Sequence, residues 1–132
     1  MRYPRIQRRG EETVGFVVKP IEVYHPERPE KRETLDLLVD TGALHSVIPA
    51  HVLESLGIRR LRSSEFEMID GSVIARDLGV AATQWNDKRG ATDVIFGEPN
   101  DKPVLGVLSL EAMGLEVDPV RGELKPMQLL LL

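Results

Sequence analysis

The chain has 132 residues, a length that suits one compact domain, and 42% of them are hydrophobic, enough to form a core without disulfides or a structural metal. Its 21 acidic residues outnumber its 17 basic ones, and the net charge of -4 argues against nucleic-acid binding, which needs a basic face. Cysteine is absent, which excludes disulfide scaffolds, cysteine nucleophiles and thiolate metal sites. The longest run of large apolar residues, 129–132, is far shorter than the ~20 needed to span a bilayer, so no membrane partner is expected.

The N-terminus is basic, with four arginines among its first nine residues and no apolar stretch behind them. We expect residues 1–12 to be a basic segment outside the fold, either a mobile tail or a processed piece. Residues 13–132 would then form the single domain. A secretory signal requires an apolar stretch, so the expected location is cytoplasmic.

The first half of the chain predicts strands separated by polar segments. Residues 13–24 are rich in Val, Ile, Phe and Tyr and predict a strand. The charged stretch 25–33 contains two prolines and predicts an exposed loop. Residues 35–39, LDLLV, are almost continuously apolar and predict a buried strand that ends at Asp40.

The middle of the chain predicts a short helix and a hairpin. Pro49 at the start and Gly57 just past the end predict a two-turn helix between them. Residues 64–85 predict two extended segments around the turn dipeptide Asp70–Gly71. A further turn, at 86–90, leads into another strand.

Two parts of the chain resemble each other. The strand and glycine of Leu37–Gly42 lead to a short helix closed by a glycine, and Pro103–Gly106 leads to a second such helix over 107–113. This weak repeat suggests a domain built from two halves about a pseudo-twofold axis. Residues 116–126 then predict a strand, a tight turn and a strand.

Asp40 is the residue whose position most suggests chemistry. It stands at the end of a predicted buried strand, where an unpaired carboxylate would cost several kcal/mol. Thr41 offers a hydroxyl, and Gly42 lets the backbone fold close and present its N–H to the carboxylate. The tripeptide Asp-Thr-Gly alone occurs by chance in roughly a few per cent of chains this long, so its context decides.

That context resembles the retropepsin-like aspartic proteases, in particular bacterial-type single-domain members. Leu37–Ala43, then Ser46–Pro49 and a short helix ending in Leu-Gly-Ile, resemble the segment around the family's catalytic aspartate. Val104–Gly106 before a helix is similar to the family's hydrophobic-hydrophobic-glycine motif. The hairpin with Asp70–Gly71 at its tip stands where the family has its flap, and the matches cover residues 35–118 in order.

The resemblance implies a mostly β fold: a closed antiparallel β-barrel-like retropepsin domain with one or two short helices. It also implies a homodimer, because the enzyme needs two facing carboxylates and the chain has one Asp-Thr-Gly. Asp40 would meet its own copy across a twofold axis. The two carboxylates would share a proton, one activating a water and the other protonating the developing oxyanion and leaving amine.

The resemblance also assigns roles to single residues. Asp40 would be catalytic, Thr41 would hydrogen-bond across the dimer, and Gly42 would orient the carboxylate. An extended polypeptide substrate would contact Gly42, Ala43 and the hairpin tip. The tip residues expected to close over it are Ile69, Asp70, Gly71 and Ser72. No cofactor or metal is implied.

The chain departs from the family in a few places. Val107 follows Gly106 where retroviral members carry a polar residue that ties down the dimer, and the hairpin tip has one glycine where retroviral flaps have several. These departures favour an alternative function, a catalytically inactive dimerisation or peptide-binding module. His45 is expected at the surface. The leucines after Met127 either pack in a dimer interface or form a final strand over their own subunit.

Other enzyme classes find little support. His25, His45 and His51 form no recognised metal-binding pair. The chain has no Gly-x-Ser-x-Gly motif and no glycine-rich loop that carries a lysine. A metal site, a serine hydrolase and a phosphate-binding loop are therefore disfavoured.

Overall fold

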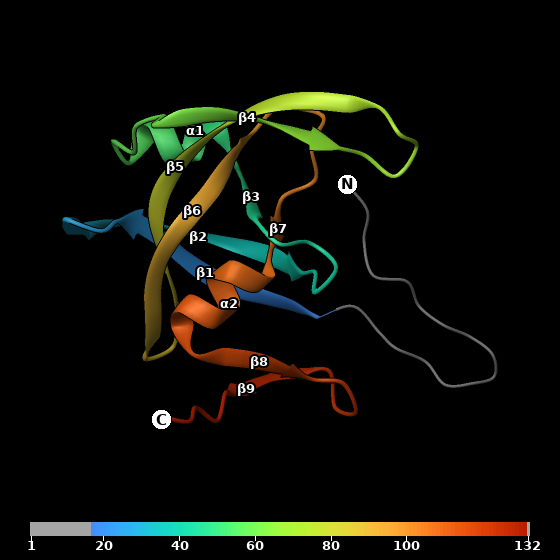
Figure 1. Ribbon diagram of the computed structural model, residues 1–132. Coiled ribbons are helices and arrows are strands. Elements are labelled where there is room, and N and C mark those ends of the chain that lie inside the picture. The colour runs from blue at the N-terminus through green and yellow to red at the C-terminus, as the bar shows by residue number, and fades with distance from the viewer. Residues whose placement is uncertain (1–16, 132) are drawn as a thin grey trace.

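The computed structural model describes residues 17–131, so the predictions for residues 1–12 lie outside it. Seven strands form one sheet in the order β1-β2-β7-β3-β6-β5-β4, and an additional pairing between β1 and β5 closes the sheet into a ring (Figure 1). The remaining two strands pair with each other. The strands are β1 (Val18–His25), β2 (Arg28–Val39), β3 (Ser46–Pro49), β4 (Arg62–Glu67), β5 (Val73–Trp85), β6 (Lys88–Gly97), β7 (Val104–Leu105), β8 (Leu115–Asp118) and β9 (Glu123–Pro126). The helices are α1 (Ala50–Ser55) and α2 (Val107–Met113).

The predicted mostly β class is confirmed, but the sheet is mixed rather than antiparallel throughout. β2 runs parallel to β7, with Val39 beside Leu105, and β3 runs parallel to β6. The parallel pair β2 and β7 consists of the corresponding strands of the two halves of the weak sequence repeat. Parallel neighbours need long crossover connections, which a chain-order pattern of turns does not reveal.

The exposed loop predicted for residues 25–33 is wrong, because β2 begins at Arg28 and pairs with β1. The turn is confined to Pro26 and Glu27, between the paired residues His25 and Arg28. The charged side chains of this strand lie at the surface while its backbone is hydrogen-bonded to β1. Arg32, for example, stacks on the Tyr24 ring and pairs with Glu22 at 2.7 Å. A run of charged residues is therefore compatible with a strand whose side chains face water.

The hairpin of β4 and β5 forms as predicted, and it projects beyond the rest of the sheet (Figure 1). Its tip is a three-residue loop, because the Met68 N–H donates to the Ser72 carbonyl at 2.8 Å. Gly71 has a φ of 89°, the left-handed conformation that such a loop requires at its last position. The predicted second turn is also present but shorter, since β6 begins at Lys88.

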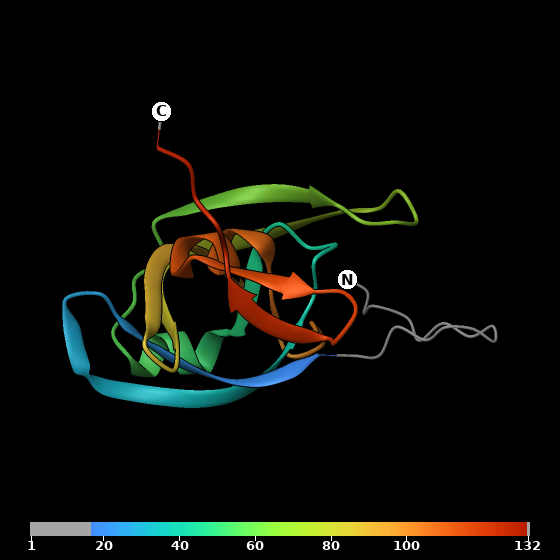
Figure 2. The same ribbon diagram turned by 90° about the horizontal axis from the view of Figure 1, so that it is seen from below.

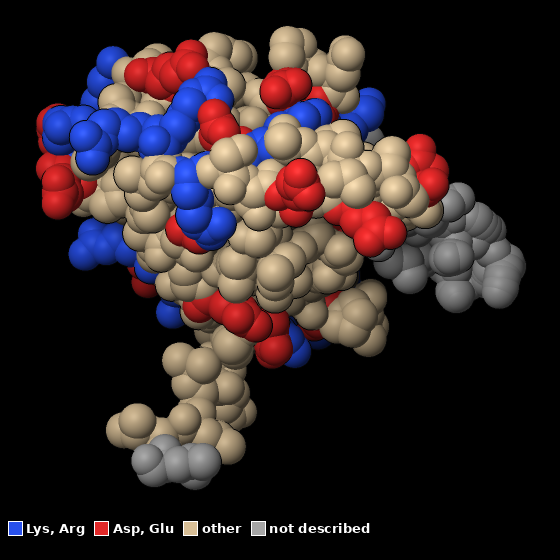
Figure 3. All heavy atoms as spheres, turned by 45° about the horizontal axis from the view of Figure 1, so that its top comes forward, with Lys and Arg blue, Asp and Glu red and all other residues tan. Residues whose placement is uncertain are grey.

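The C-terminal part forms the predicted hairpin of β8 and β9, which lies below the other strands in Figure 1 and in front of them in Figure 2. The chain then leaves the body and projects from it (Figure 3), with Leu129, Leu130 and Leu131 at 72%, 83% and 100% exposure. The possibility of a final strand over the same subunit is therefore wrong. No helix among residues 17–131 is long and apolar enough to cross a membrane.

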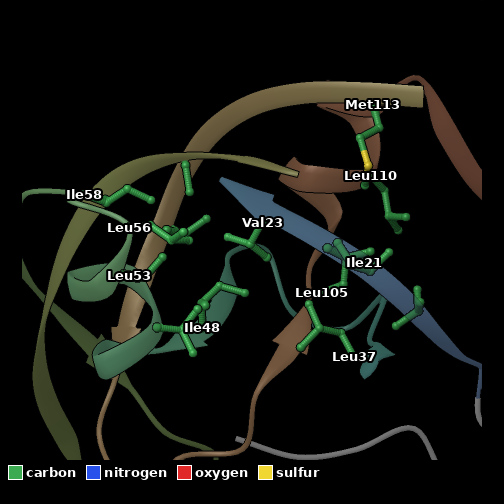
Figure 4. Packing of buried hydrophobic residues seen from close by; sticks show 14 of the residues in the cluster. Ile21, Val23, Leu37, Ile48, Leu53, Leu56, Ile58, Leu105, Leu110 and Met113 are labelled. Atoms are coloured by element: carbon green, nitrogen blue, oxygen red, sulfur yellow. The ribbon is translucent and has the colours of Figure 1, made fainter. Parts of the chain in front are cut away.

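The main hydrophobic core fills the space between the sheet and α1 and α2 (Figure 4). α1 contributes Val52 and Leu53, and α2 contributes Leu110 and Met113. Pro49 precedes α1 as its N-cap rather than lying in its first turn, and Gly57 follows with a φ of 77°. Each strand-to-helix unit of the repeat therefore buries one face of its helix in the same core.

Gly106 connects β7 to α2 at a point of close backbone approach. A Cβ atom at this position would lie 2.6 Å from the His45 carbonyl carbon and oxygen and 2.8 Å from the Leu44 carbonyl oxygen. Backbone atoms cannot move aside as a flexible side chain can. Any side chain at position 106 would clash with this backbone, so the position requires glycine.

We expect Gly106→Ala to lower the free energy of unfolding by about 1–3 kcal/mol, because the added methyl group must displace the backbone of residues 44–45. Chemical denaturation of the variant and the wild type measures this loss. Glu111→Ala on the exposed face of α2 is the control and should change stability by less than about 0.5 kcal/mol. Equal stability of Gly106→Ala and the wild type would contradict the close contact.

Candidate active site

Asp40 lies at the end of β2, where the backbone turns away from the sheet. Its N–H donates to the Leu105 carbonyl of β7 at 2.9 Å, and its own carbonyl accepts from the Ala43 N–H at 3.0 Å. The first contact continues the parallel pairing of β2 and β7, and the second closes a tight turn over Thr41 and Gly42. The residue is only 2% exposed. The strand pairing thus carries a carboxylate into the interior.

The two oxygens of the Asp40 carboxylate have different surroundings. Oδ1 accepts a hydrogen bond from the Gly42 N–H at 2.9 Å. Oδ2 is buried and has no hydrogen-bond partner within residues 17–131. Buried polar atoms nearly always have a partner, so this oxygen is an exception that asks for an explanation.

The turn that carries Asp40 is held by the N-terminus of α2. The Val107 N–H donates to the Ala43 carbonyl and the Leu108 N–H to the Leu44 carbonyl, both at 2.9 Å. These are N–H groups of the first helical turn, which have no partner within the helix itself. The loop over residues 41–45 supplies the acceptors that cap the helix.

A buried pair of hydroxyls adds a second attachment. Ser46 of β3 and Ser109 of α2 are both fully buried, and their Oγ atoms lie 2.6 Å apart. Ser46 Oγ also accepts the Gly106 N–H at 2.9 Å. Both ends of the Asp40 turn are therefore fixed to the glycine-and-helix unit of the second half.

A cavity of about 460 Å³ lies between the Asp40 turn and the β4–β5 hairpin. Its lining is mostly apolar. The lining residues are Asp40, Gly42, Ala43, Leu44, His45, Val47, Phe66, Glu67, Met68, Ile69, Ile74, Arg76, Ile95 and Asp101. The volume falls in the range of small-molecule and peptide side-chain sites, which are concave and apolar with a few polar groups.

The residues expected to form the site fall into two groups. Asp40, Gly42, Ala43 and Ile69 line the cavity together. The remaining ones do not: Thr41 is exposed on the outside of the turn, and the rest of the tip is exposed as well. Those tip residues are Asp70, Gly71 and Ser72. The polar groups of these residues bond to one another within the tip: Asp70 Oδ1 accepts hydrogen bonds from the Ser72 N–H at 2.9 Å and from the Ser72 Oγ at 2.7 Å.

The surface position expected for His45 is wrong, because the residue is half-buried and lines the cavity. Its ring meets the edge of Phe66 of β4, with centroids 5.8 Å apart at 80°. Burial lowers the pKa of the imidazole below its ordinary 6.5; Asp93 opposes this effect and Arg62 adds to it. The ring is therefore biased toward its neutral form.

Arg76 and Asp101 line the cavity although no sequence pattern pointed to them. Arg76 Nε lies 2.7 Å from Asp101 Oδ2, and Nη2 lies 2.8 Å from Oδ1. This bidentate pair raises the pKa of Arg76 and lowers the pKa of Asp101, chiefly through the hydrogen bonds between them. The two residues lie 25 positions apart in unrelated segments, so only the fold brings them together.

No group of three His, Cys, Asp or Glu side chains that could hold a metal occurs in the described part of the chain. The chain matches no family model, no curated protein and no solved structure.

Removing the hydroxyl of Ser46 should destabilise the protein more than removing that of Ser109. Ser46→Ala leaves both Ser109 Oγ and the Gly106 N–H without a partner, at a cost of about 1–3 kcal/mol per buried group. Ser109→Ala leaves the Ser46–Gly106 bond in place. Urea unfolding of the two variants measures the order, and a greater loss in Ser109→Ala would contradict it.

The stability of the wild type should fall when the pH is lowered from 7.5 to 5.0, and His45 should account for part of that loss. Because the folded-state pKa of His45 is lowered, the unfolded chain takes up the proton first, and its uptake below about pH 6.5 favours unfolding. His45→Gln should lose less stability over this range. Asp93→Asn, which removes a group that raises this pKa, should lose more. Urea unfolding at the two pH values gives the comparison, and identical losses in all three proteins would contradict it.

Proposed function

We propose that this protein is an aspartic endopeptidase of the retropepsin type that acts as a homodimer and hydrolyses peptide bonds of an extended polypeptide. The observation that carries the proposal is the buried carboxylate of Asp40, a residue that lines an apolar cavity and whose Oδ2 has no hydrogen-bond partner among residues 17–131. A carboxylate oxygen left without a partner in the interior destabilises a fold. A group that must bind and activate a water needs an oxygen of this kind.

The reaction requires a second carboxylate, and the cavity offers none that is suitable. Asp101 is held in its bidentate pair with Arg76, and Glu67 lies exposed on the hairpin. A second copy of Asp40 is therefore the partner we propose. The exposed Thr41 and Gly42, together with Leu44 at 57% exposure, surround the turn with surface that a twofold-related copy can cover.

In the dimer the two carboxylates share one proton, because two charges at close range cannot both be accommodated. The ionised carboxylate removes a proton from the bound water, whose oxygen attacks the scissile carbonyl carbon. The protonated carboxylate donates to the carbonyl oxygen and forms a gem-diol intermediate. The carboxyl group that took the water proton then gives it to the nitrogen as the C–N bond breaks. The other carboxylate removes a hydroxyl proton from the gem-diol, which becomes the new carboxylic acid, so the pair again holds one proton.

The hairpin and cavity support a polypeptide as the substrate. A projecting two-stranded hairpin can cover an extended chain, and the apolar wall suits a large apolar side chain next to the scissile bond. Because the same features would serve a catalytically inactive peptide-binding module, activity has to be tested directly.

The test is cleavage of a diverse peptide library between pH 4 and 7 by the wild type, Asp40→Asn and Asp36→Asn. Asp36 lies on the same strand but is exposed, so it controls for the charge change. We expect the wild type and Asp36→Asn to cut and Asp40→Asn to be slower by at least about 10²-fold. A binding module is indicated if no variant cuts while the wild type retains peptides.

A mixing experiment tests the dimer itself. Adding an excess of Asp40→Asn to a fixed amount of wild type should depress cleavage, because mixed dimers carry only one Asp40. The same excess of Gly42→Pro, whose ring would remove the Oδ1 hydrogen bond and disturb the turn, should depress it less. Unchanged activity at any excess of Asp40→Asn would show that one copy suffices.

A further inference from the structure

We propose that Arg76 and Asp101 are positioning residues that latch the β4–β5 hairpin over the Asp40 turn and place the pivot of the hairpin at Arg76 rather than at its base. This inference rests on the proposed function only for its effect on substrate. The latch itself can be observed without any catalysis.

The hairpin needs something to set its direction. β5 pairs with β6 only from Leu78 to Trp85, and among residues 17–131 no strand other than β5 pairs with β4. Within the described part of the chain, residues 63–77 therefore form a two-stranded ribbon without a third strand (Figure 1). Such a ribbon is marginally stable in isolation and twists freely, so its orientation is decided by side-chain contacts.

The contact between Arg76 and Asp101 fixes direction as well as distance. Its two parallel hydrogen bonds, at 2.7 and 2.8 Å, join a planar guanidinium to a planar carboxylate. The side chains are 15% and 17% exposed, well below those of the pairs Arg60–Asp77 and Arg62–Asp93. Arg76 Nη1 also lies 3.7 Å from Oε1 of the exposed Glu98. Partial removal from water makes the Arg76–Asp101 pair stronger than an exposed one.

Asp101 connects the hairpin to the Asp40 turn. Its Oδ2 also accepts the Glu98 N–H at 2.8 Å, and its own N–H donates to the Glu98 carbonyl at 2.8 Å, which folds the loop over residues 98–103. That loop runs beneath the hairpin into β7, whose Leu105 accepts the Asp40 N–H (Figure 1). One ion pair thus links the hairpin to the strand that holds Asp40.

The other strand of the hairpin is held at a similar level. Phe66 of β4, paired in register with Ile74, meets the ring of His45 in the Asp40 turn. The tip beyond these contacts includes Ile69 at 80% exposure and Val73 at 58%. If the hairpin opens, the geometry therefore lets the tip move while the ribbon stays fixed at Phe66 and Arg76, so the bend lies on the tip side of these two residues.

Bound substrate should tighten the latch. Both residues line the cavity, so a peptide that fills it excludes water from the ion pair and strengthens the attraction. Loss of the pair should then weaken substrate binding more than the chemical step.

The experiment measures the hairpin position by electron spin resonance. The chain has no cysteine, so Val73→Cys on the hairpin and Glu111→Cys on α2 give two unique spin-label sites. The full chain carries Asp40→Asn to prevent self-cleavage, and labelled protein is diluted with unlabelled protein so that distances within one chain are recorded. The compared variants are Arg76→Gln, Asp101→Asn, Arg76→Lys and the reversed pair Arg76→Asp/Asp101→Arg.

We expect one narrow distance distribution with the native pair and a broader, longer one in Arg76→Gln and Asp101→Asn. The width of the distribution in Arg76→Lys should be intermediate, because lysine keeps the charge but cannot form the two parallel hydrogen bonds of the guanidinium. The reversed pair should restore the narrow distribution. Arg62→Gln is the matched control, since it breaks a 2.6 Å pair with Asp93 at the exposed hairpin base and should leave the distance unchanged. Unchanged distributions in the single variants, or no restoration by the folded reversed pair, would overturn the proposal.

With Asp40 restored and a library-derived peptide as substrate, Arg76→Gln should raise KM roughly tenfold and change kcat less than about threefold. A fall in kcat with KM unchanged would overturn the proposed role in substrate binding. If no peptide is ever cleaved, the proposed function fails while the distance measurement still decides the latch.

Discussion

A pair of buried hydroxyls is the interaction on which the candidate site depends. Ser46 and Ser109 come from the two halves of the chain, and their contact, with the Gly106 N–H on the same oxygen, holds the Asp40 turn against α2. The carbonyls of residues 43 and 44 in turn satisfy the first N–H groups of that helix. In the apolar interior each of these groups would be costly without its partner, so the turn has one stable arrangement.

The sequence predicted most of the elements and the part of the site that lies within one segment. The apolar run before Asp40, the Asp70–Gly71 hairpin and the two helices have strong local signals, and all are present. The loop predicted for residues 25–33 is wrong because an exposed strand and a loop have similar composition. The parallel pairing of β2 with β7 could not be predicted from spacing, since its partners lie far apart in the chain.

The polar part of the cavity could not be predicted either, because its residues also come from segments far apart in the chain. The surface position predicted for His45 is wrong because the fold turns its ring toward Phe66, and Arg76 and Asp101 belong to segments with no motif. Together these residues surround an apolar space with one neutral-biased imidazole and one closed ion pair. Besides Asp40, the cavity lining contains one further carboxylate outside this ion pair, that of Glu67 on the exposed face of the hairpin. An apolar lining of this kind screens the field of a buried carboxylate only weakly.

The pairing of β2 with β7 also has a consequence for the order of folding. Leu38 and Val39 pair with Val104 and Leu105, so a loop of some sixty residues must close before the end of β2 is paired with β7. The hairpins β1–β2, β4–β5 and β5–β6 need only local closure and can form earlier. During synthesis the Asp40 turn therefore cannot reach its final arrangement until the residues of β7 and α2 have been made.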